Sequence, residues 1–241
     1  MENLKVLIAA ALFDGHDVSI NLFRRLLLKR GAEVIHLGHN RSVQEIIKTA
    51  LEEDVDGILI SSYQGGHNEF FRYLVDSLKA NNAEHIRVLG GGGGVILPDE
   101  IEELQKYGVE KLYHATEGQR IGIDGIGDDI VERLRKAKDH KNGLMLTDQL
   151  LQRNSTDNHY LLAQELSIIE KAQDDTAEIK ALRSLLPKYD KGKSVVIGVT
   201  GTGGSGKSSL IDELIGRFSH ISRDAKIAVL AVDPTKSKTK G

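Results

Sequence analysis

The first 138 residues predict a doubly wound α/β fold built on a parallel sheet. Short apolar runs, each long enough for one buried strand, alternate with stretches of about 10–15 residues whose apolar side chains recur at helical spacing. This alternation is typical of parallel βαβ units, whose helices cover both faces of one sheet. Five strands and five helices within this length fit a flavodoxin-like domain, in which ligands bind outside the carboxyl ends of the strands.

The strands are predicted from runs of aliphatic residues, which mark strands that are buried on both faces. They span Lys5–Ala11, Glu33–Leu37, Gly57–Ser61, Arg87–Leu89 and Lys111–His114. The helices are predicted where apolar residues recur every three or four positions between those runs. They span Ile20–Arg30, Val43–Glu53, Asn68–Ala80, Asp99–Tyr107 and Ile126–Ala137.

The composition excludes several classes of protein. The chain has 32 Lys and Arg against 35 Asp and Glu, so its net charge of −3 argues against a nucleic-acid partner held by phosphate contacts. It has no Cys, which excludes disulfides, thiolate zinc sites, iron–sulfur clusters and cysteine nucleophiles. The early apolar run Val6–Phe13 is shorter than the roughly 18 residues that span a membrane, and no signal-peptide cleavage site follows it. We therefore expect a cytoplasmic protein without a membrane partner.

The pattern changes twice after residue 138. Residues 139–192 are polar with apolar side chains at helical spacing, and they predict a helical connector that ends at Pro187. From residue 193 the sequence predicts a strand, a glycine-rich loop, a helix and a second strand at Ser194–Val199, Gly201–Ser208, Ser208–Phe218 and Lys226–Val232. A single βαβ unit is too little for a complete nucleotide-binding domain, so residues 193–241 are expected to be the start of one.

A phosphate-binding loop is predicted at Gly201–Ser208, because GTGGSGKS matches GxxxxGK[ST] between a predicted strand and a predicted helix. The residues expected around the phosphates are Gly203, Gly204, Ser205, Gly206, Lys207 and Ser208. In this motif the lysine reaches the terminal phosphates and the last hydroxyl holds Mg²⁺. Asp233 ends the following strand and is a second candidate Mg²⁺ ligand, although an Asp before Pro also starts turns. The motif alone does not distinguish GTP from ATP.

Asp14-Gly15-His16 stands where the first predicted strand meets the first helix, at the ligand-binding edge of such a sheet. A carboxylate two residues before an imidazole suits a metal ligand. The Asp accepts a hydrogen bond from one ring nitrogen and leaves the other nitrogen free to coordinate. A histidine at a strand end is also common as a surface or capping residue, so the pair needs support from its neighbours.

Two further features follow neighbouring strands at the same edge. Ser61-Ser62-Tyr63 follows the third strand, and five consecutive glycines, Gly90 to Gly94, follow the fourth. Such a run leaves a stretch of chain without side chains, open to a large ligand that lies against it. A flexible loop would also be rich in glycine, but this run leads directly into Val95-Ile96-Leu97-Pro98 and is poorly explained as a linker.

Together these features resemble the cobalamin-binding domain of adenosylcobalamin-dependent mutases, whose fingerprint is DxHxxG, then SxL, then GG. The matching residues are Asp14 and His16, then Ser61, then Gly93 and Gly94. Ser19 replaces the glycine of the first motif, and Tyr63 replaces the leucine of the second. A cobalamin domain followed by a connector and a phosphate loop further resembles the fused isobutyryl-CoA mutases. In that family a small G-protein chaperone lies between the cofactor domain and the substrate barrel.

The resemblance covers essentially the whole chain and implies a mechanism. His16 would ligate the cobalt of adenosylcobalamin in place of dimethylbenzimidazole, and Asp14 would hydrogen-bond the imidazole. The displaced nucleotide tail would pass Ser61 and cross Gly93 and Gly94. The activity would be a radical rearrangement of an acyl-CoA, of the isobutyryl-CoA to n-butyryl-CoA type, with the acyl-CoA held by a domain outside this chain. GTP and Mg²⁺ would act at the phosphate loop to control cofactor loading, and the full-length protein would be a homodimer.

Two other interpretations remain open at this point. A cobalamin-dependent methyltransferase module, or a light or redox sensor, shares the Asp-x-His, Ser and Gly-Gly pattern but would not carry a phosphate loop at residue 201. A phosphate-loop chaperone or partition ATPase with an unrelated flavodoxin-like domain would leave His16 and the glycine run without a ligand. Retention of a pink chromophore after addition of hydroxocobalamin separates this second interpretation from a cobalamin-binding mutase.

Overall fold

The computed structural model describes residues 4–16, 18–142, 159–171, 180, 195–222, 224 and 226–231. The chain divides into two compact units, residues 1–188 and 189–241, and each is described by itself. Among the described residues, no helix is long and apolar enough to cross a membrane.

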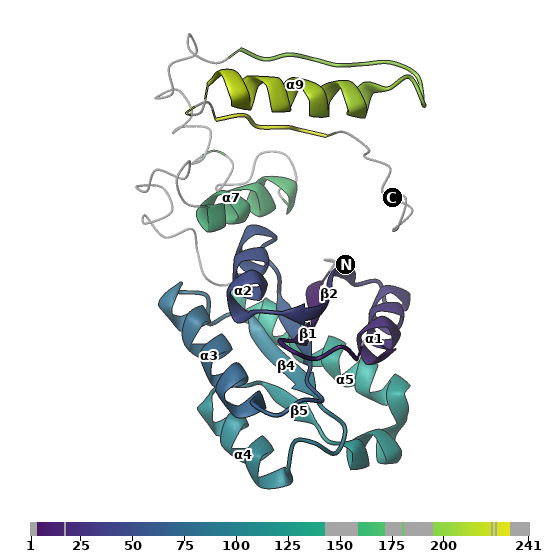
Figure 1. The fold of residues 1–241 in the computed structure, drawn as a ribbon. Coiled ribbons are helices and arrows are strands. Elements are labelled where there is room, and N and C mark those ends of the chain that lie inside the picture. Colours follow the sequence, from purple (N-terminus) through teal and green to yellow (C-terminus); the bar gives the residue numbers. More distant parts are fainter. Residues whose placement is uncertain are drawn as a thin grey trace. The chain divides into compact units, whose positions relative to one another are not determined.

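The first unit is built on one parallel sheet of five strands in the order β2-β1-β3-β4-β5 (Figure 1). The strands are β1 (Lys5–Ala11), β2 (Glu33–Arg41), β3 (Gly57–Ser61), β4 (Arg87–Gly91) and β5 (Lys111–Tyr113). The helices that follow them are α1 (Val18–Lys29), α2 (Val43–Glu52), α3 (His67–Ala80), α4 (Pro98–Tyr107) and α5 (Ala115–Asn142). The predicted fold class is therefore confirmed. β2 is added on one side of β1 and β3 on the other, so the order of the strands changes direction between β1 and β3.

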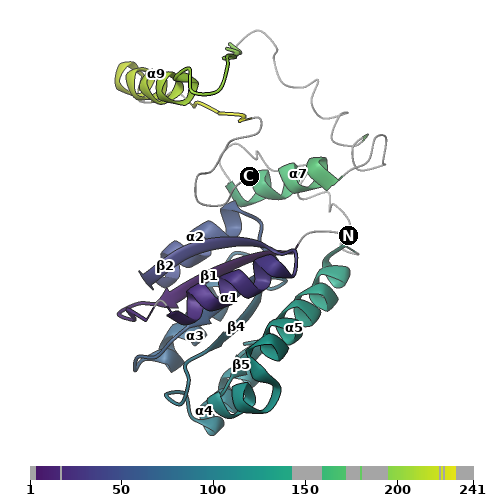
Figure 2. The same ribbon diagram turned by 90° about the vertical axis from the view of Figure 1, so that its right-hand side faces the viewer.

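Helices cover both faces of the sheet, as Figure 2 shows from the side. Along β1, the side chains of Leu7 and Ala9 join a core formed with α2, α3 and α4. Those of Val6 and Ile8 join a second core formed with α1 and α5. This two-sided burial is the reason that β1 is apolar at every position after Lys5.

β2 and α5 differ most from the prediction, and β4 includes Gly90 and Gly91, which were expected to follow it. β2 continues past Leu37 to Arg41, because Gly38 adopts a φ of 84° and Asn40 a φ of 56°. These left-handed residues form irregularities that let the strand stay paired with β1 up to Ala11. α5 begins at Ala115 rather than at Ile126, and it contains a kink at Gly122, whose φ of 71° is not helical.

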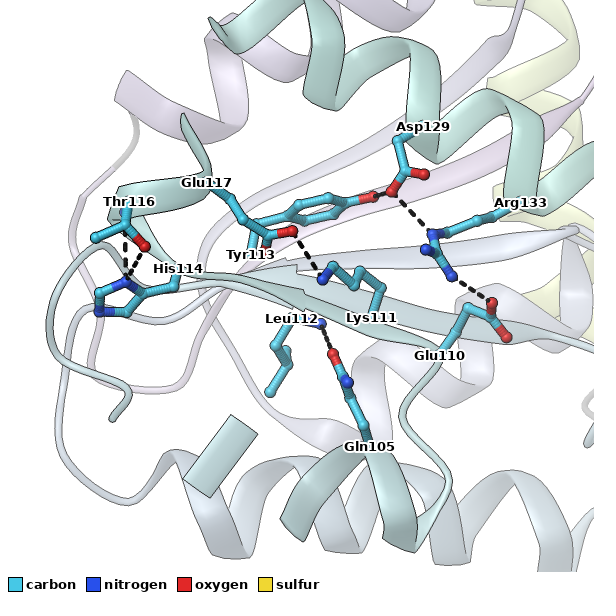
Figure 3. A network of polar contacts seen from close by, with 10 residues as sticks. All are labelled: Gln105, Glu110, Lys111, Leu112, Tyr113, His114, Thr116, Glu117, Asp129 and Arg133. Atoms are coloured by element: carbon cyan, nitrogen blue, oxygen red, sulfur yellow. Dashed lines mark hydrogen bonds and ion pairs between the residues drawn. The ribbon is translucent and has the colours of Figure 1, made fainter. Parts of the chain in front are cut away.

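Polar contacts fix α5 against β5, as Figure 3 shows. The hydroxyl of Tyr113 donates to Asp129, whose carboxylate also accepts from Arg133. Burial and this hydrogen bond raise the pKa of Tyr113, so the phenol stays protonated. Further along α5, Lys138 and Asp56 form a buried ion pair of 2.9 Å at the amino-terminal edge of the sheet, where Asp56 also accepts from the backbone of Lys5.

Helix α7 (His159–Lys171) lies within the predicted connector and packs on α2. Its Tyr160 stacks on His85, with ring centroids 6.2 Å apart, and the two side chains are hydrogen-bonded over 3.1 Å. Ala163 and Ser167 are buried on the same side of the helix. Most of the remaining connector lies outside the described residues.

The second unit contains helix α9 (Lys207–Ile221) after the glycine-rich loop, as predicted. The two predicted strands are not found in the described residues 195–200 and 226–231. A strand is held by hydrogen bonds to a neighbouring strand, and among the described residues no strand pairs with either segment. Their apolar side chains are accordingly exposed, as Val196 and Leu230 are at 92% each. Asp233, the candidate Mg²⁺ ligand, lies outside the described residues.

Candidate functional site

Three turns meet at the carboxyl edge of the sheet, where β1, β3 and β4 lie side by side. The turn after β1 carries Asp14 and His16, the turn after β3 carries Ser62 and Tyr63, and the turn after β4 carries Gly92 to Gly94. The fold therefore brings together all of the residues that the sequence predicted for this edge.

Asp14 is the centre of the hydrogen bonds in this region and is completely buried. Its Oδ1 atom accepts from the backbone N–H of His16 over 2.9 Å and lies 2.6 Å from Nδ1 of the His16 ring. Its Oδ2 atom accepts from the backbone N–H of Tyr63 over 2.7 Å. One carboxylate thus joins the turn after β1 to the turn after β3.

The His16 ring is held at one nitrogen only. Because a carboxylate oxygen accepts, Nδ1 carries the proton in this contact and Nε2 keeps its lone pair when the imidazole is neutral. The side chain of His16 is 61% exposed, and no hydrogen bond of its Nε2 is found within the described part of the chain. This is the arrangement of a histidine oriented for a metal ion that arrives from outside the protein.

Ser61 is the last residue of β3 and is buried. Its hydroxyl is 2.7 Å from the hydroxyl of Ser19, the residue that replaces the glycine of the first motif. Since each hydroxyl has one proton and the two share one of them, the pair retains a proton to donate to a third group. Ser19, which stands in place of the motif's glycine, therefore contributes its hydroxyl to the site.

The glycines after β4 differ from one another in what they tolerate. A Cβ at Gly92 would lie 1.9 Å from the carbonyl oxygen of Ser62, so the two backbones meet there too closely for any side chain. Gly93 has a φ of 61°, and a Cβ there would lie 2.8 Å from the Tyr63 ring. Around Gly94 nothing lies within 4 Å, which leaves open space in front of the backbone. Gly92 was not among the predicted site residues, although its place in the run of five glycines was a signal for it.

A polar cluster around Glu100 fixes the end of the glycine loop that leads into α4. Glu100, in the first turn of α4, accepts from the backbone N–H of Leu97 over 2.8 Å. Its two carboxylate oxygens also contact His67 and Asn68 in the first turn of α3, each over 3.0 Å. The backbone hydrogen bond from Leu97, with the contacts to His67 and Asn68, holds the pKa of Glu100 below its usual range in spite of partial desolvation. The loop is thus attached at both ends to rigid elements.

Apolar side chains are exposed around these turns. They come from the β1–α1 turn, from the first residue of α1, from the end of the glycine loop and from the first half of α5: Leu12, Phe13, Val18, Val95, Leu97, Ile121 and Ile123. Phe13 is 79% exposed even though its backbone is fixed by a hydrogen bond from its N–H to Asn40. Exposed apolar groups in this number around a polar centre are typical of a ligand surface.

The phosphate loop of the second unit has the expected local form. Gly204 and Gly206 adopt φ angles of 75° and 83°, and no atom lies within 4 Å of a Cβ built at either. The Nζ atom of Lys207 donates to the carbonyl oxygens of Gly201 and Thr202, over 2.7 and 2.6 Å. The lysine therefore already lies across the loop that its motif uses for phosphate.

The cavity found at the opposite edge of the sheet is not part of this site. It measures about 260 Å³ and is lined by Arg87, Glu110, Asp129, Glu132, Arg133, Lys136 and Ala137. Acidic and basic side chains are equal in number there, and most of them pair with one another. Within the described residues, no group of three or more His, Asp or Glu side chains could hold a metal ion by itself.

Two family models match the chain. The model described as "B12 binding domain" matches residues 4–116, which include all three turns of the site. The model described as "Methylmalonyl Co-A mutase-associated GTPase MeaB" matches residues 162–241, which include the phosphate loop.

Two curated relatives align with nearly the whole chain, and a third aligns with about half of it. The fused isobutyryl-CoA mutase of Geobacillus kaustophilus is 45% identical over 251 aligned residues, which cover 99% of this chain and 22% of that protein. The one from Cupriavidus metallidurans is 48% identical over 240 residues, covering 97% of this chain and 21% of that protein. The chain thus spans about a fifth of these relatives. The 2-hydroxyisobutanoyl-CoA mutase small subunit of Aquincola tertiaricarbonis is 33% identical over 132 residues, covering 54% of this chain and 94% of that subunit. The chain therefore belongs to the acyl-CoA mutase family with a B12 binding domain, and over nearly its whole length it is similar to the fused isobutyryl-CoA mutases.

Proposed function

We propose that this chain is the cobalamin-binding and GTP-binding part of an acyl-CoA mutase that rearranges isobutyryl-CoA and n-butyryl-CoA. The single observation that carries the proposal is the His16 ring, hydrogen-bonded at Nδ1 to the buried Asp14 and exposed at the edge of the sheet. The names of the relatives support the reaction class, and the match to a GTPase model supports the nucleotide.

The residues present fit cobalamin. A cobalt ion needs a neutral imidazole nitrogen, and the contact between Asp14 and Nδ1 leaves Nε2 for that purpose. A corrin ring is large, and its faces are apolar while its periphery carries amide groups; the apolar faces suit the exposed side chains of Phe13 and Leu97. The open space at Gly94 suits the displaced nucleotide tail. The chemistry supplied by bound adenosylcobalamin is homolysis of its cobalt–carbon bond, and the acyl-CoA would be held outside this chain.

Each group of this chain has a binding task in the proposed reaction. His16 would hold the cobalt, and Asp14 orients the imidazole through its contact with Nδ1. Ser61, with Ser19 behind it, can donate a hydrogen bond to the tail of the cofactor. In the second unit, Lys207 would exchange the carbonyls of Gly201 and Thr202 for phosphate oxygens, and Ser208 and Asp233 would hold Mg²⁺.

The test is the nitrogen that ligates cobalt. The chain is produced with ¹⁵N-labelled histidine and loaded with cob(II)alamin, whose unpaired electron couples to the axial nitrogen. We expect the electron paramagnetic resonance spectrum to show coupling to a ¹⁵N nucleus, and His16→Ala to abolish that coupling. His39→Ala, which removes an exposed histidine of β2, is the matched control and should leave the spectrum unchanged. Coupling to an unlabelled nitrogen would mean that dimethylbenzimidazole remains bound to cobalt and would refute the proposal.

A further inference from the structure

Tyr63 stands where the fingerprint of cobalamin-binding mutases has a leucine, and its ring lies between the two halves of the site. Its centroid is 5.3 Å from that of the His16 ring, with the planes tilted by 43°. Its atom Cε1 lies 2.8 Å from the position that a Cβ would take at Gly93. The ring is therefore close to both His16 and the glycine loop.

This position lies across the path of the proposed cofactor tail. The tail would run from His16 past Ser61 and over Gly93, and the Tyr63 ring contacts the first and the last of these residues. A ring and a nucleotide cannot share one volume in a closely packed site. Either the turn or the side chain has to move before the tail can enter.

The backbone of this turn is fixed, so the side chain is the part that can move. The N–H of Tyr63 donates to Asp14 over 2.7 Å, and the N–H of Ser62 donates to Gly91 over 2.9 Å. The Tyr63 residue is 36% exposed, so part of its side chain already faces solvent. Rotations of exposed side chains take place in picoseconds to nanoseconds.

We propose that the Tyr63 side chain is a gate for cobalamin, which rests on His16 and Gly93 and swings outward when the cofactor enters. This inference rests on the proposed function. Only the open fraction of molecules accepts the tail, so the observed association rate constant is the intrinsic one multiplied by that fraction. Closure is favoured by an aromatic contact of ordinary strength, and its removal should raise the association rate constant about three- to tenfold.

The experiment compares three variants of the whole chain. Tyr63→Leu restores the residue of the fingerprint and removes the ring. Tyr63→Phe keeps the ring and is expected to behave as the wild type, because the described contacts of Tyr63 use its ring and its backbone N–H. Tyr73→Leu removes a half-exposed tyrosine on α3 and is the matched control. Stopped-flow absorbance follows the change of adenosylcobalamin from its free to its histidine-ligated spectrum.

A second readout does not use the cofactor. In the cofactor-free chain, the ring protons of His16 should shift in the NMR spectrum when Tyr63 becomes leucine, because the ring current of the tyrosine is lost. They should not shift in Tyr73→Leu. This measurement tests the resting contact independently of the proposed function.

Faster association in Tyr63→Leu alone, with an unchanged dissociation rate constant, would establish the gate. An unchanged association rate with faster dissociation would instead show that the ring supports bound His16, and it would overturn the proposal. If the wild type fails to ligate cobalt through His16 in the labelling experiment, the proposed function falls and the gate with it. If the wild type does ligate cobalt through His16 and Tyr63→Leu changes neither rate constant, only the gate falls.

Discussion

Asp14 combines a role in the site with a role in the fold. It orients His16 and also accepts the N–H of Tyr63, a residue 49 positions later in the chain. We predict that Asp14→Asn lowers the free energy of unfolding by about 1–3 kcal/mol, because an amide nitrogen would then face a buried N–H donor. Chemical denaturation measures the loss.

His16→Ala is the matched comparison for Asp14. It removes the ring contact but leaves the bond between Asp14 and the N–H of Tyr63 in place. A smaller loss of stability is therefore expected for His16→Ala than for Asp14→Asn. Equal losses would mean that the bond to Tyr63 contributes nothing to stability.

Gly93 and Gly94 are expected to respond differently to substitution, although the fingerprint treats them as a pair. Gly93→Ala places a Cβ on a backbone with a φ of 61° and against Tyr63, so it should destabilise the fold by about 1–2 kcal/mol or more. Gly94→Ala meets open space and should leave the melting temperature of the cofactor-free chain unchanged. Gly94→Val should weaken cobalamin binding without that cost, as a titration followed by absorbance would show. A fall in melting temperature for Gly94→Ala would contradict this distinction.

The residues of the site could be predicted from sequence, but not all of their relations. Asp14, His16 and Ser61 follow strands whose carboxyl ends must meet in a parallel sheet, so their proximity follows from the fold class. The contact between Ser19 and Ser61 could not be predicted, because it depends on how the first turn of α1 is aimed at β3. The close approach at Gly92 depends on the backbone of Ser62, which no sequence pattern specifies.

The first turns of α3 and α4 are joined by Glu100, and this contact should depend on pH. The pKa of Glu100 is lower in the folded chain than in the unfolded chain, so its contribution to stability is complete above the ordinary glutamate pKa. That contribution is lost as the pH falls through the lowered value and the carboxyl group takes up a proton. We predict that Glu100→Gln reduces the melting temperature at neutral pH and reduces the slope of melting temperature against pH below about pH 5. An unchanged slope in this variant would show that other acidic groups account for the loss.

The helices and strands of the first unit were predictable because each carries one strong pattern. β1 and β3 are apolar at nearly every position, and the helices repeat apolar residues at their own period. The extension of β2 to Arg41 was missed, because left-handed residues at Gly38 and Asn40 resemble the end of a strand. The strands of the second unit were expected from apolarity alone, although a strand also needs a partner.

At the scale of the whole molecule, the two proposed ligand sites belong to different units and should respond to different mutations. We predict that Lys207→Ala reduces GTP binding at least tenfold, since this amine is the positive charge of the phosphate loop. The ¹⁵N coupling of His16 to cobalt should be unchanged in the same variant. Equilibrium binding of a fluorescent GTP analogue measures the first quantity. Loss of the cobalt coupling would show that the sites depend on each other.

The boundaries at residues 138 and 192 stay a prediction, because residues 143–158 and 181–194 lie outside the described part of the chain. The expected homodimer also stays a prediction.

The ion pair between Lys138 and Asp56 restricts where the gene segment for this domain can be cut without loss of stability. Asp56 lies just before β3, in the middle of the first domain, whereas Lys138 is in the last turns of α5. A gene rearrangement that cut the chain before Lys138 would leave a buried carboxylate without its cation, at a cost of about 3–5 kcal/mol. We therefore expect recombination that transfers this domain between enzymes to preserve its stability only when the end of α5 is included, although that end lies at the opposite edge of the sheet from Asp14 and His16.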